Sequence, residues 1–326
     1  MKKLAKKMRK RGIETLFAGL ALMSDYTRRQ RKARSLSVIH RGVPYIQDGD
    51  PAHTLDIYRP RDAGGPLPVL VYIHGGGFTM CSKDTHRAIA LAYSHYGKMA
   101  VFNVNYRLAP RHRYPAATED VAAAYAWVVE NAARYGGDPS RIVVGGESAG
   151  GNLTLALGVM ASYERPETFA RRVFDLFRPP LALLVLCGLL QVSDPDRFLK
   201  EKAAEIPGRR LSMHQGIARD VSKAYLGQGF ESPDPERILA DPLLILESGA
   251  RPDRPFPDVF TMVGDKDILI SDTRRLEAAL ARLGLPCEAR YYNGVGHAFQ
   301  TLFWKSQALD FWRDNFRFLY RLFPRA

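Results

Sequence analysis

Short apolar runs alternate with longer amphipathic segments along most of the chain. The apolar runs predict strands at 55–60, 69–73, 100–104, 141–145, 181–188, 258–263 and 287–292. The amphipathic segments predict helices at 82–98, 119–135, 152–157, 163–178, 272–283 and 304–321. Strands that alternate with helices are typical of a mainly parallel α/β sheet flanked by helices.

Residues 193–240 interrupt this alternation. The segment is polar and helical in pattern, contains no predicted strand, and lies between two strands of the sheet. A helical insertion at this place predicts a cap over the sheet.

The first 42 residues differ from the rest of the chain. Apolar positions at helical spacing predict one amphipathic face, formed by Ile13, Leu16, Phe17, Leu20 and Met23. Glu14 lies inside this stretch and no small-residue cleavage site follows it, which disfavours a secretory signal peptide. Two interpretations remain: the helix packs on its own protein, or it rests on anionic lipid.

The net charge of +13 is concentrated in that same segment. Residues 1–41 contain 13 Lys and Arg against two Asp and Glu, a net of +11, which leaves +2 for the other 285 residues. A nearly neutral body disfavours a nucleic-acid partner, because such proteins carry their basic patch on the fold itself.

Neither the cysteines nor the hydropathy indicates an oxidised or membrane-spanning protein. Cys81, Cys187 and Cys287 are scattered and have no metal-ligand spacing, which predicts reduced thiols and no zinc site. No apolar run reaches the ~18–20 residues that span a bilayer. These features favour a cytoplasmic location, with peripheral membrane contact through the basic segment as the alternative.

A Gly-x-Ser-x-Gly pattern joins a predicted strand to a predicted helix. The strand 141–145 leads into Gly146-Glu147-Ser148-Ala149-Gly150-Gly151, and an apolar helical segment follows. Strand, sharp turn and helix are the context that a nucleophile elbow requires. Ser148 is therefore the candidate nucleophile.

A serine nucleophile needs a base and an orienting carboxylate, which follow it in this order in such folds. The strand 258–263 is followed by three acids, Asp265, Asp267 and Asp272. Asp272 lies at the start of the next predicted helix, where N-capping or stabilisation of the helix dipole is sufficient to explain an acid. Spacing hardly separates the other two, although Asp267 is favoured. His297 lies in a glycine-containing loop after the last strand and is the candidate base.

Acyl transfer also needs donors for the developing oxyanion. His74-Gly75-Gly76-Gly77-Phe78 follows the strand 69–73, and consecutive glycines expose backbone N–H groups. The N–H of Ala149, next to the nucleophile, is the second expected source.

Together these motifs resemble the hormone-sensitive-lipase-like carboxylesterases of the α/β-hydrolase fold, from about residue 43 to the C-terminus. The motifs that carry the resemblance are His74 to Phe78, Tyr106-Arg107-Leu108-Ala109-Pro110, Pro115 to Asp120, Gly146 to Asn152, Asp267-Ile268-Leu269 with Asp272, and Gly296-His297 with Phe299.

The resemblance implies a catalytic triad of Ser148, Asp267 and His297. It implies oxyanion donors at Gly75, Gly76 and Ala149. It also implies a catalytic domain of residues 43–192 and 241–326, with a cap built from 1–42 and 193–240. Arg111, in place of an acid, and Ile268, in place of a proline, depart from the family pattern.

The predicted function is therefore a serine esterase that cleaves short- to medium-chain carboxylic esters through an acyl-enzyme. The expected partner is a small ester, with no cofactor and no metal, and a homodimer is left open. Met213, Tyr225 and Phe230 are candidates for an acyl pocket, with packing between cap and body as the alternative. Cys81 is expected to border the site or to be a plain core residue. The alternative functions are an amidase or deacetylase on the same triad, and a catalytically silent binding protein of this fold.

Overall fold

A computed structural model of the protein describes residues 28–198, 208–231 and 234–324. Eight strands form one sheet in the order β1-β2-β4-β3-β5-β6-β7-β8. Both pairings of β2 are antiparallel, and the neighbours from β4 to β8 are parallel. The strands are β1 (Ser37–Pro44), β2 (Thr54–Pro60), β3 (Leu67–Ile73), β4 (Ala100–Val104), β5 (Gly137–Glu147), β6 (Ala182–Leu186), β7 (Asp258–Gly264) and β8 (Cys287–Tyr292).

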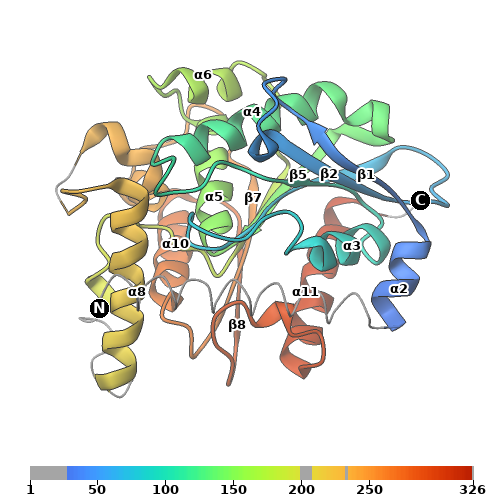
Figure 1. Ribbon diagram of the computed structural model, residues 1–326. Coiled ribbons are helices and arrows are strands. Elements are labelled where there is room, and N and C mark those ends of the chain that lie inside the picture. Colours follow the sequence, from blue (N-terminus) through green and yellow to red (C-terminus); the bar gives the residue numbers. More distant parts are fainter. Residues whose placement is uncertain (1–27, 199–207, 232–233, 325–326) are drawn as a thin grey trace.

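Helices cover both faces of the sheet (Figure 1). The described helices are α2 (Arg28–Ser35), α3 (Arg87–His95), α4 (Ala116–Asn131), α5 (Ala149–Ser162), α6 (Thr168–Phe174), α8 (Gly208–Leu226), α9 (Pro242–Glu247), α10 (Ile270–Leu283) and α11 (Ser306–Leu322). This architecture confirms the predicted mainly parallel α/β fold. Among the described helices, none is long and apolar enough to cross a membrane.

The core divides into two apolar clusters because successive side chains of a strand point to opposite faces. On β3, Val69, Val71 and Ile73 pack with α4, α5 and α10, whereas Leu70 and Tyr72 pack with α3 and α11. The central strands are buried on both faces, which explains why they read as continuous apolar runs in the sequence.

The sheet begins a few residues before position 43, where the sequence places the start of the catalytic domain. Residues 37–42 are part of β1, which pairs with β2 at the edge of the sheet. Its Val38, Ile39 and Val43 are interrupted by polar residues and a bulge, so the segment gives a weak strand pattern. The amphipathic face predicted over 13–23 lies outside the described residues.

Parallel pairing brings the predicted motifs to one edge of the sheet. Ile73 is paired with Gly146, so the loop after β3 lies beside the turn after β5. The loops after β7 and β8 open at the same carboxyl edge, which is where sites of open α/β sheets form.

Candidate active site

Ser148 is the single residue between β5 and α5. Its backbone has φ 57° and ψ −117°, a strained conformation for a residue other than glycine. Its N–H donates to Leu186 O at 2.9 Å, and its carbonyl accepts from Leu189 N at 3.1 Å. Both backbone groups are thus bound to neighbouring segments, which holds the strained turn and leaves the half-buried side chain at the cavity.

The glycines on either side of Ser148 are required by the close approach of β3. A Cβ on Gly146 would lie 2.5 Å from Ile73 O, and one on Gly150 would lie 2.1 Å from the same oxygen. No side chain fits at those distances without displacing the strand. The Gly-x-Ser-x-Gly pattern is therefore explained here by packing of the turn against β3.

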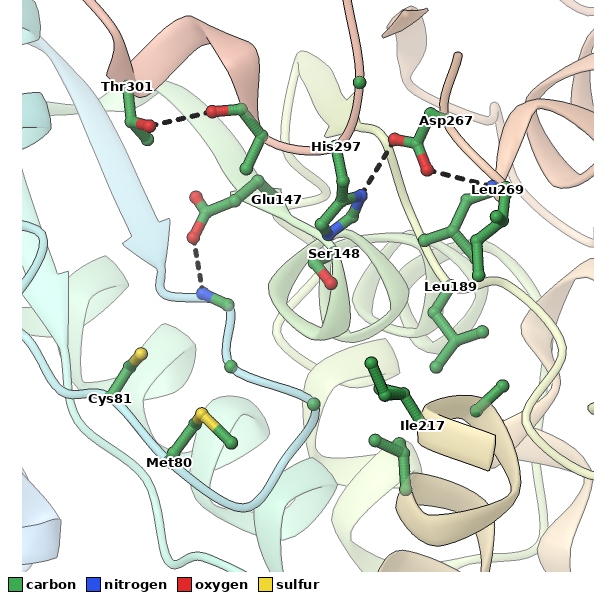
Figure 2. A pocket seen from close by; sticks show the side chains of 18 of the residues that line it. Met80, Cys81, Glu147, Ser148, Leu189, Ile217, Asp267, Leu269, His297 and Thr301 are labelled. Carbon is green, nitrogen blue, oxygen red and sulfur yellow. Dashed lines mark hydrogen bonds and ion pairs between the residues drawn. The ribbon is translucent and has the colours of Figure 1, made fainter. Parts of the chain in front are cut away.

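Asp267 and His297 come together from the loops after β7 and β8. His297 Nδ1 lies 2.8 Å from Asp267 Oδ2, and Asp267 Oδ1 accepts from Leu269 N at 3.0 Å. The Asp267 side chain is fully buried, whereas that of His297 is 40% exposed. Figure 2 shows the second ring nitrogen of His297 on the side of Ser148, and all three side chains line one cavity.

The structure also separates the two carboxylates that spacing left unresolved. Asp265 Oδ1 accepts from Gly294 N at 2.8 Å, so Asp265 secures the loop that precedes His297. Asp267 contacts the imidazole itself. Between the two, only Asp267 is placed to orient a base.

The charge environment of His297 favours its protonated form. Partial removal of the ring from water lowers the pKa of His297, but the Asp267 carboxylate and its hydrogen bond outweigh this effect. The pKa is therefore raised above its ordinary value. This is the balance expected for a base that must hold a proton during one step and release it in the next.

Gly75 does not fit its predicted role as an oxyanion donor. Its N–H donates to the buried Glu147 Oε1 at 2.6 Å, so the group is not available to a substrate oxygen. Gly76 and Gly77 follow with φ +115° and +58°, which only glycine adopts readily. Within the described chain, no acceptor faces the N–H of Gly76 or Gly77.

Ala149 is the first residue of α5, and its N–H has no intrahelical partner at this position. The residue is fully buried beside Ser148 and does not itself line the cavity. The positive end of the helix dipole at this N-terminus favours negative charge nearby. Three N–H groups, of Gly76, Gly77 and Ala149, are thus left around Ser148.

The cavity at Ser148 has a volume of about 400 Å³ and is mostly apolar in its lining. Met80, Leu189 and Leu269 contribute from the body, and Ile217 and Val221 contribute from α8 (Figure 2). Cys81 also lines it, as expected from its place after the glycine loop. Ile268, one of the two departures from the family pattern, is a lining residue too.

Two of the three residues proposed from sequence to line an acyl pocket do not do so. Tyr225 and Phe230 are buried in the core and are not among the cavity residues. The side chains of Met213 and His214 lie outside the described residues. Sequence reasoning chose the large side chains of the insertion, whereas the smaller Ile217, Ala218 and Val221 of α8 line the cavity.

Asp272 has a partner that the sequence did not indicate. It lies in the first turn of α10, as predicted, but Leu269 occupies the cap position and no side chain caps the helix. The buried carboxylate binds the Arg197 guanidinium, with Nη2 to Oδ2 at 2.6 Å, and accepts from Leu190 N at 2.8 Å. Asp272 therefore ties the start of the insertion to the catalytic body.

Cys187 adds a thiol next to the Asp267–His297 pair, and the ligand atoms of these three residues lie within 4.8 Å of one another. Burial raises the pKa of the Cys187 thiol well above its ordinary value, which disfavours the thiolate that binds metals. The carboxylate is also already bound to the imidazole. Among the described residues, no disulfide joins Cys81, Cys187 or Cys287.

Comparison with known proteins agrees with this geometry. Residues 70–301 match the α/β hydrolase fold family. The chain is 45% identical over 189 residues to the carboxylesterase NlhH of Mycobacterium tuberculosis, a match that covers 55% of this chain and 57% of that one. It is 28% identical over 242 residues to the esterase LipU of the same organism, covering 73% and 72%.

Among solved structures, the esterase LipW from Mycobacterium marinum superposes with a TM-score of 0.72 at 23% identity, covering 97% of this chain and 89% of that one. A bacterial heroin esterase superposes with a TM-score of 0.70, also at 23% identity, covering 89% and 84%. At this identity the likeness establishes the fold.

Proposed function

Because the chain belongs to the α/β hydrolase fold family, and resembles its hormone-sensitive-lipase-like carboxylesterases, we propose that it is a serine esterase. The observation that carries this proposal is the contact of 2.8 Å between Asp267 and His297 in the cavity where Ser148 sits on a strained elbow. Nucleophile, base and orienting group are the parts that acyl transfer through a covalent intermediate requires.

Acylation begins when the Ser148 hydroxyl attacks the carbonyl carbon of an ester and His297 Nε2 takes its proton. Asp267 holds Nδ1–H, which fixes the tautomer and stabilises the imidazolium. The negative charge on the carbonyl oxygen is stabilised by the N–H groups of Gly76, Gly77 and Ala149. His297 then protonates the departing alkoxide, and the acyl group remains on Ser148.

Deacylation repeats these steps with water. His297 accepts a proton from the water as it attacks the acyl carbonyl, and then returns a proton to Ser148 as the acid leaves. No step calls for a cofactor or a metal. Hydrogen bonds at catalytic groups commonly tighten only when substrate binds, so we expect the Ser148–His297 hydrogen bond to form in the substrate complex.

The lining of the cavity supports short- to medium-chain esters as substrates. Its volume of about 400 Å³ lies toward the smaller end of the ~300–1,000 Å³ typical of small-molecule sites. Apolar side chains such as Met80, Leu189 and Val221 suit an aliphatic acyl or alcohol group. Lys266 also lines the cavity, and its charged side chain is 72% exposed.

The insertion 193–240 serves as a cap in this proposal. Its helix α8 supplies Ile217, Ala218 and Val221 to the cavity, so it covers the site. Substrate size is then set by the cap, and the bond-breaking chemistry by the body.

The basic N-terminal segment supports peripheral contact with anionic lipid. Exposed Arg31, Lys32 and Arg34 on α2 continue its charge into the described chain. Replacing these three residues by Gln in the full-length protein should weaken co-sedimentation with phosphatidylserine vesicles and leave phosphatidylcholine binding unchanged. Equal binding to both vesicles by the wild-type protein would contradict this contact.

The esterase itself is tested by replacing Ser148 with Ala and measuring hydrolysis of p-nitrophenyl butyrate. Loss of turnover with an unchanged circular dichroism spectrum is expected. Near wild-type activity in the variant would refute Ser148 as nucleophile, and an inactive wild-type protein would favour a silent binding protein.

A further inference from the structure

Glu147 is a buried carboxylate that lies between Ser148 and the oxyanion loop, which is the segment 74–78. It is the last residue of β5, is 2% exposed, and immediately precedes Ser148. Its Oε1 accepts from Gly75 N at 2.6 Å and lies 2.7 Å from His86 Nε2, and its Oε2 accepts from the Tyr72 hydroxyl. A buried charge requires such compensation.

The charge on this carboxylate is maintained by His86. Burial raises the pKa of Glu147, but His86 and the hydrogen bonds from Tyr72 and Gly75 outweigh it and hold the pKa below its ordinary value. Burial likewise lowers the pKa of His86, and the Glu147 carboxylate outweighs that and raises it. The two side chains form an ion pair inside the protein.

Gly75, the first glycine of the oxyanion loop, is held on both sides. The Gly75 N–H is bound to Glu147, and the Gly75 carbonyl lies 2.7 Å from His74 Nδ1. The His74 carbonyl accepts from the Tyr106 hydroxyl at 2.9 Å. Burial, followed by the neighbouring His86, lowers the pKa of His74 to about 3, so this ring is neutral and can donate from Nδ1.

The next two peptides are those that bear the free N–H groups of Gly76 and Gly77. The Gly75 carbonyl shares a peptide with the Gly76 N–H and is bound by His74. The Gly76 carbonyl shares a peptide with the Gly77 N–H and accepts from Thr79 N at 3.1 Å and Met80 N at 3.2 Å. Glu147 fixes the peptide immediately before these two, so it sets where the loop begins. The fit is close: a Cβ on Gly75 would lie 2.8 Å from Glu147 Oε1. Glu147 and Ser148 are adjacent along the backbone, so one short linkage joins nucleophile and loop.

We propose that Glu147 is a positioning residue that sets the N–H groups of the oxyanion loop relative to Ser148. It acts through Gly75 and does not contact the reacting atoms. The proposal rests on the esterase function proposed above. It assigns a reason to the acid inside the Gly-Glu-Ser-Ala-Gly turn, which the triad mechanism leaves without a role.

Two conservative variants distinguish a positioning role of Glu147 from a role in which its side chain only fills the core. Glu147→Gln keeps the reach of the side chain and an oxygen that accepts from Gly75. Glu147→Asp keeps the charge but is shorter by one methylene, so its oxygens withdraw from Gly75. Tyr72→Phe is the matched control, because it removes a partner of the same carboxylate on the side away from the loop.

The experiment measures kcat and KM for p-nitrophenyl butyrate, together with Ki for butylboronic acid, which forms a tetrahedral adduct with a serine hydroxyl. We expect Glu147→Asp to lower kcat by about 10²-fold, as loss of an oxyanion donor does, with KM within about twofold. Its Ki should rise in parallel with the loss of kcat. Glu147→Gln and Tyr72→Phe should stay within about fivefold of wild type in kcat, although both should lower the melting temperature because each removes a partner from a buried ionic cluster.

Two results would overturn the proposal. One is Glu147→Asp with wild-type kcat and boronate affinity, whatever its melting temperature. The other is Glu147→Gln with a larger loss than Glu147→Asp, which would assign the effect to charge and not to reach. An inactive wild-type protein would instead refute the esterase function itself, so the two failures are distinguishable.

Discussion

The rings of Phe78 and Tyr225 stack with centroids 3.8 Å apart and planes within 5°. Phe78 ends the oxyanion loop, and Tyr225 lies near the end of α8, so this stack joins the cap to the loop. The contact continues at Gly77, where a Cβ would lie 2.9 Å from Val221 Cγ2. The part of the protein that determines substrate size is therefore packed directly against the part that stabilises the oxyanion.

Removing the Tyr225 ring should destabilise the protein more than removing its hydroxyl. Tyr225 is fully buried, and its hydroxyl lies 3.2 Å from Thr118 Oγ1. Tyr225→Ala should lower the free energy of unfolding by about 3–5 kcal/mol, the cost of a large buried aromatic. Tyr225→Phe should cost about 1 kcal/mol, for one hydrogen bond. Urea unfolding measures both, and equal losses would contradict the importance of the stack.

Filling the cavity from α8 should shift the preference toward short acyl chains. Ile217 lines the cavity, whereas Lys223 on the same helix is exposed and does not. Ile217→Trp should lower kcat/KM for p-nitrophenyl octanoate at least about tenfold relative to the acetate, since one or two methylenes of lost space are worth that factor. Lys223→Ala is the matched control. An unchanged octanoate-to-acetate ratio in Ile217→Trp would refute this assignment of the cavity.

Neutralising Asp267, which contacts His297, should lower kcat far more than neutralising Asp265. Asp267→Asn leaves the shape of the site intact but favours the wrong imidazole tautomer, and should reduce kcat by about 10⁴-fold. Asp265→Asn, which alters a bond to Gly294 N and not to the imidazole, should change kcat by less than about tenfold. The opposite order would move the orienting role to Asp265.

The pH dependence of kcat/KM follows from the same contact. His297 must be neutral to accept the Ser148 proton, so activity rises as pH passes through its pKa. Partial loss of water lowers the pKa of His297, but Asp267 outweighs this effect and raises it. The acidic limb of the pH–rate profile should therefore have its midpoint above the ordinary pKa of histidine. In Asp267→Asn the limb should move to lower pH. A pH–rate profile of both proteins decides this, and an unshifted limb would show that another group titrates.

Sequence order and spacing predict which loops carry the candidate triad, although spacing alone hardly separates Asp267 from Asp265. Ser148 lies in a local strand–turn–helix pattern, and Asp267 and His297 each follow a strand that is itself recognisable from apolar residues. Once the strands are placed in a parallel sheet, their loops must meet at one edge. The position of these side chains therefore follows from the pattern of elements.

Contacts between distant segments were not predictable in the same way. The bond that occupies Gly75 N comes from Glu147, 72 residues away, and depends on pairing of β3 with β5 in one register. The partner of Asp272 is Arg197, 75 residues away, in the insertion. Likewise, Tyr225 on α8 packs inward because it stacks on Phe78 in a distant segment, while Ile217 and Val221 of the same helix reach the cavity.

The most direct test of the central claim is to identify the residue that a fluorophosphonate modifies. The probe reacts only with an activated hydroxyl, which displaces fluoride and retains the phosphonyl group. Peptide mass mapping should locate one adduct on Ser148, absent in Ser148→Ala and formed much more slowly in His297→Ala. An adduct on another residue, or none on the folded wild-type protein, would contradict a nucleophile at Ser148 activated by His297.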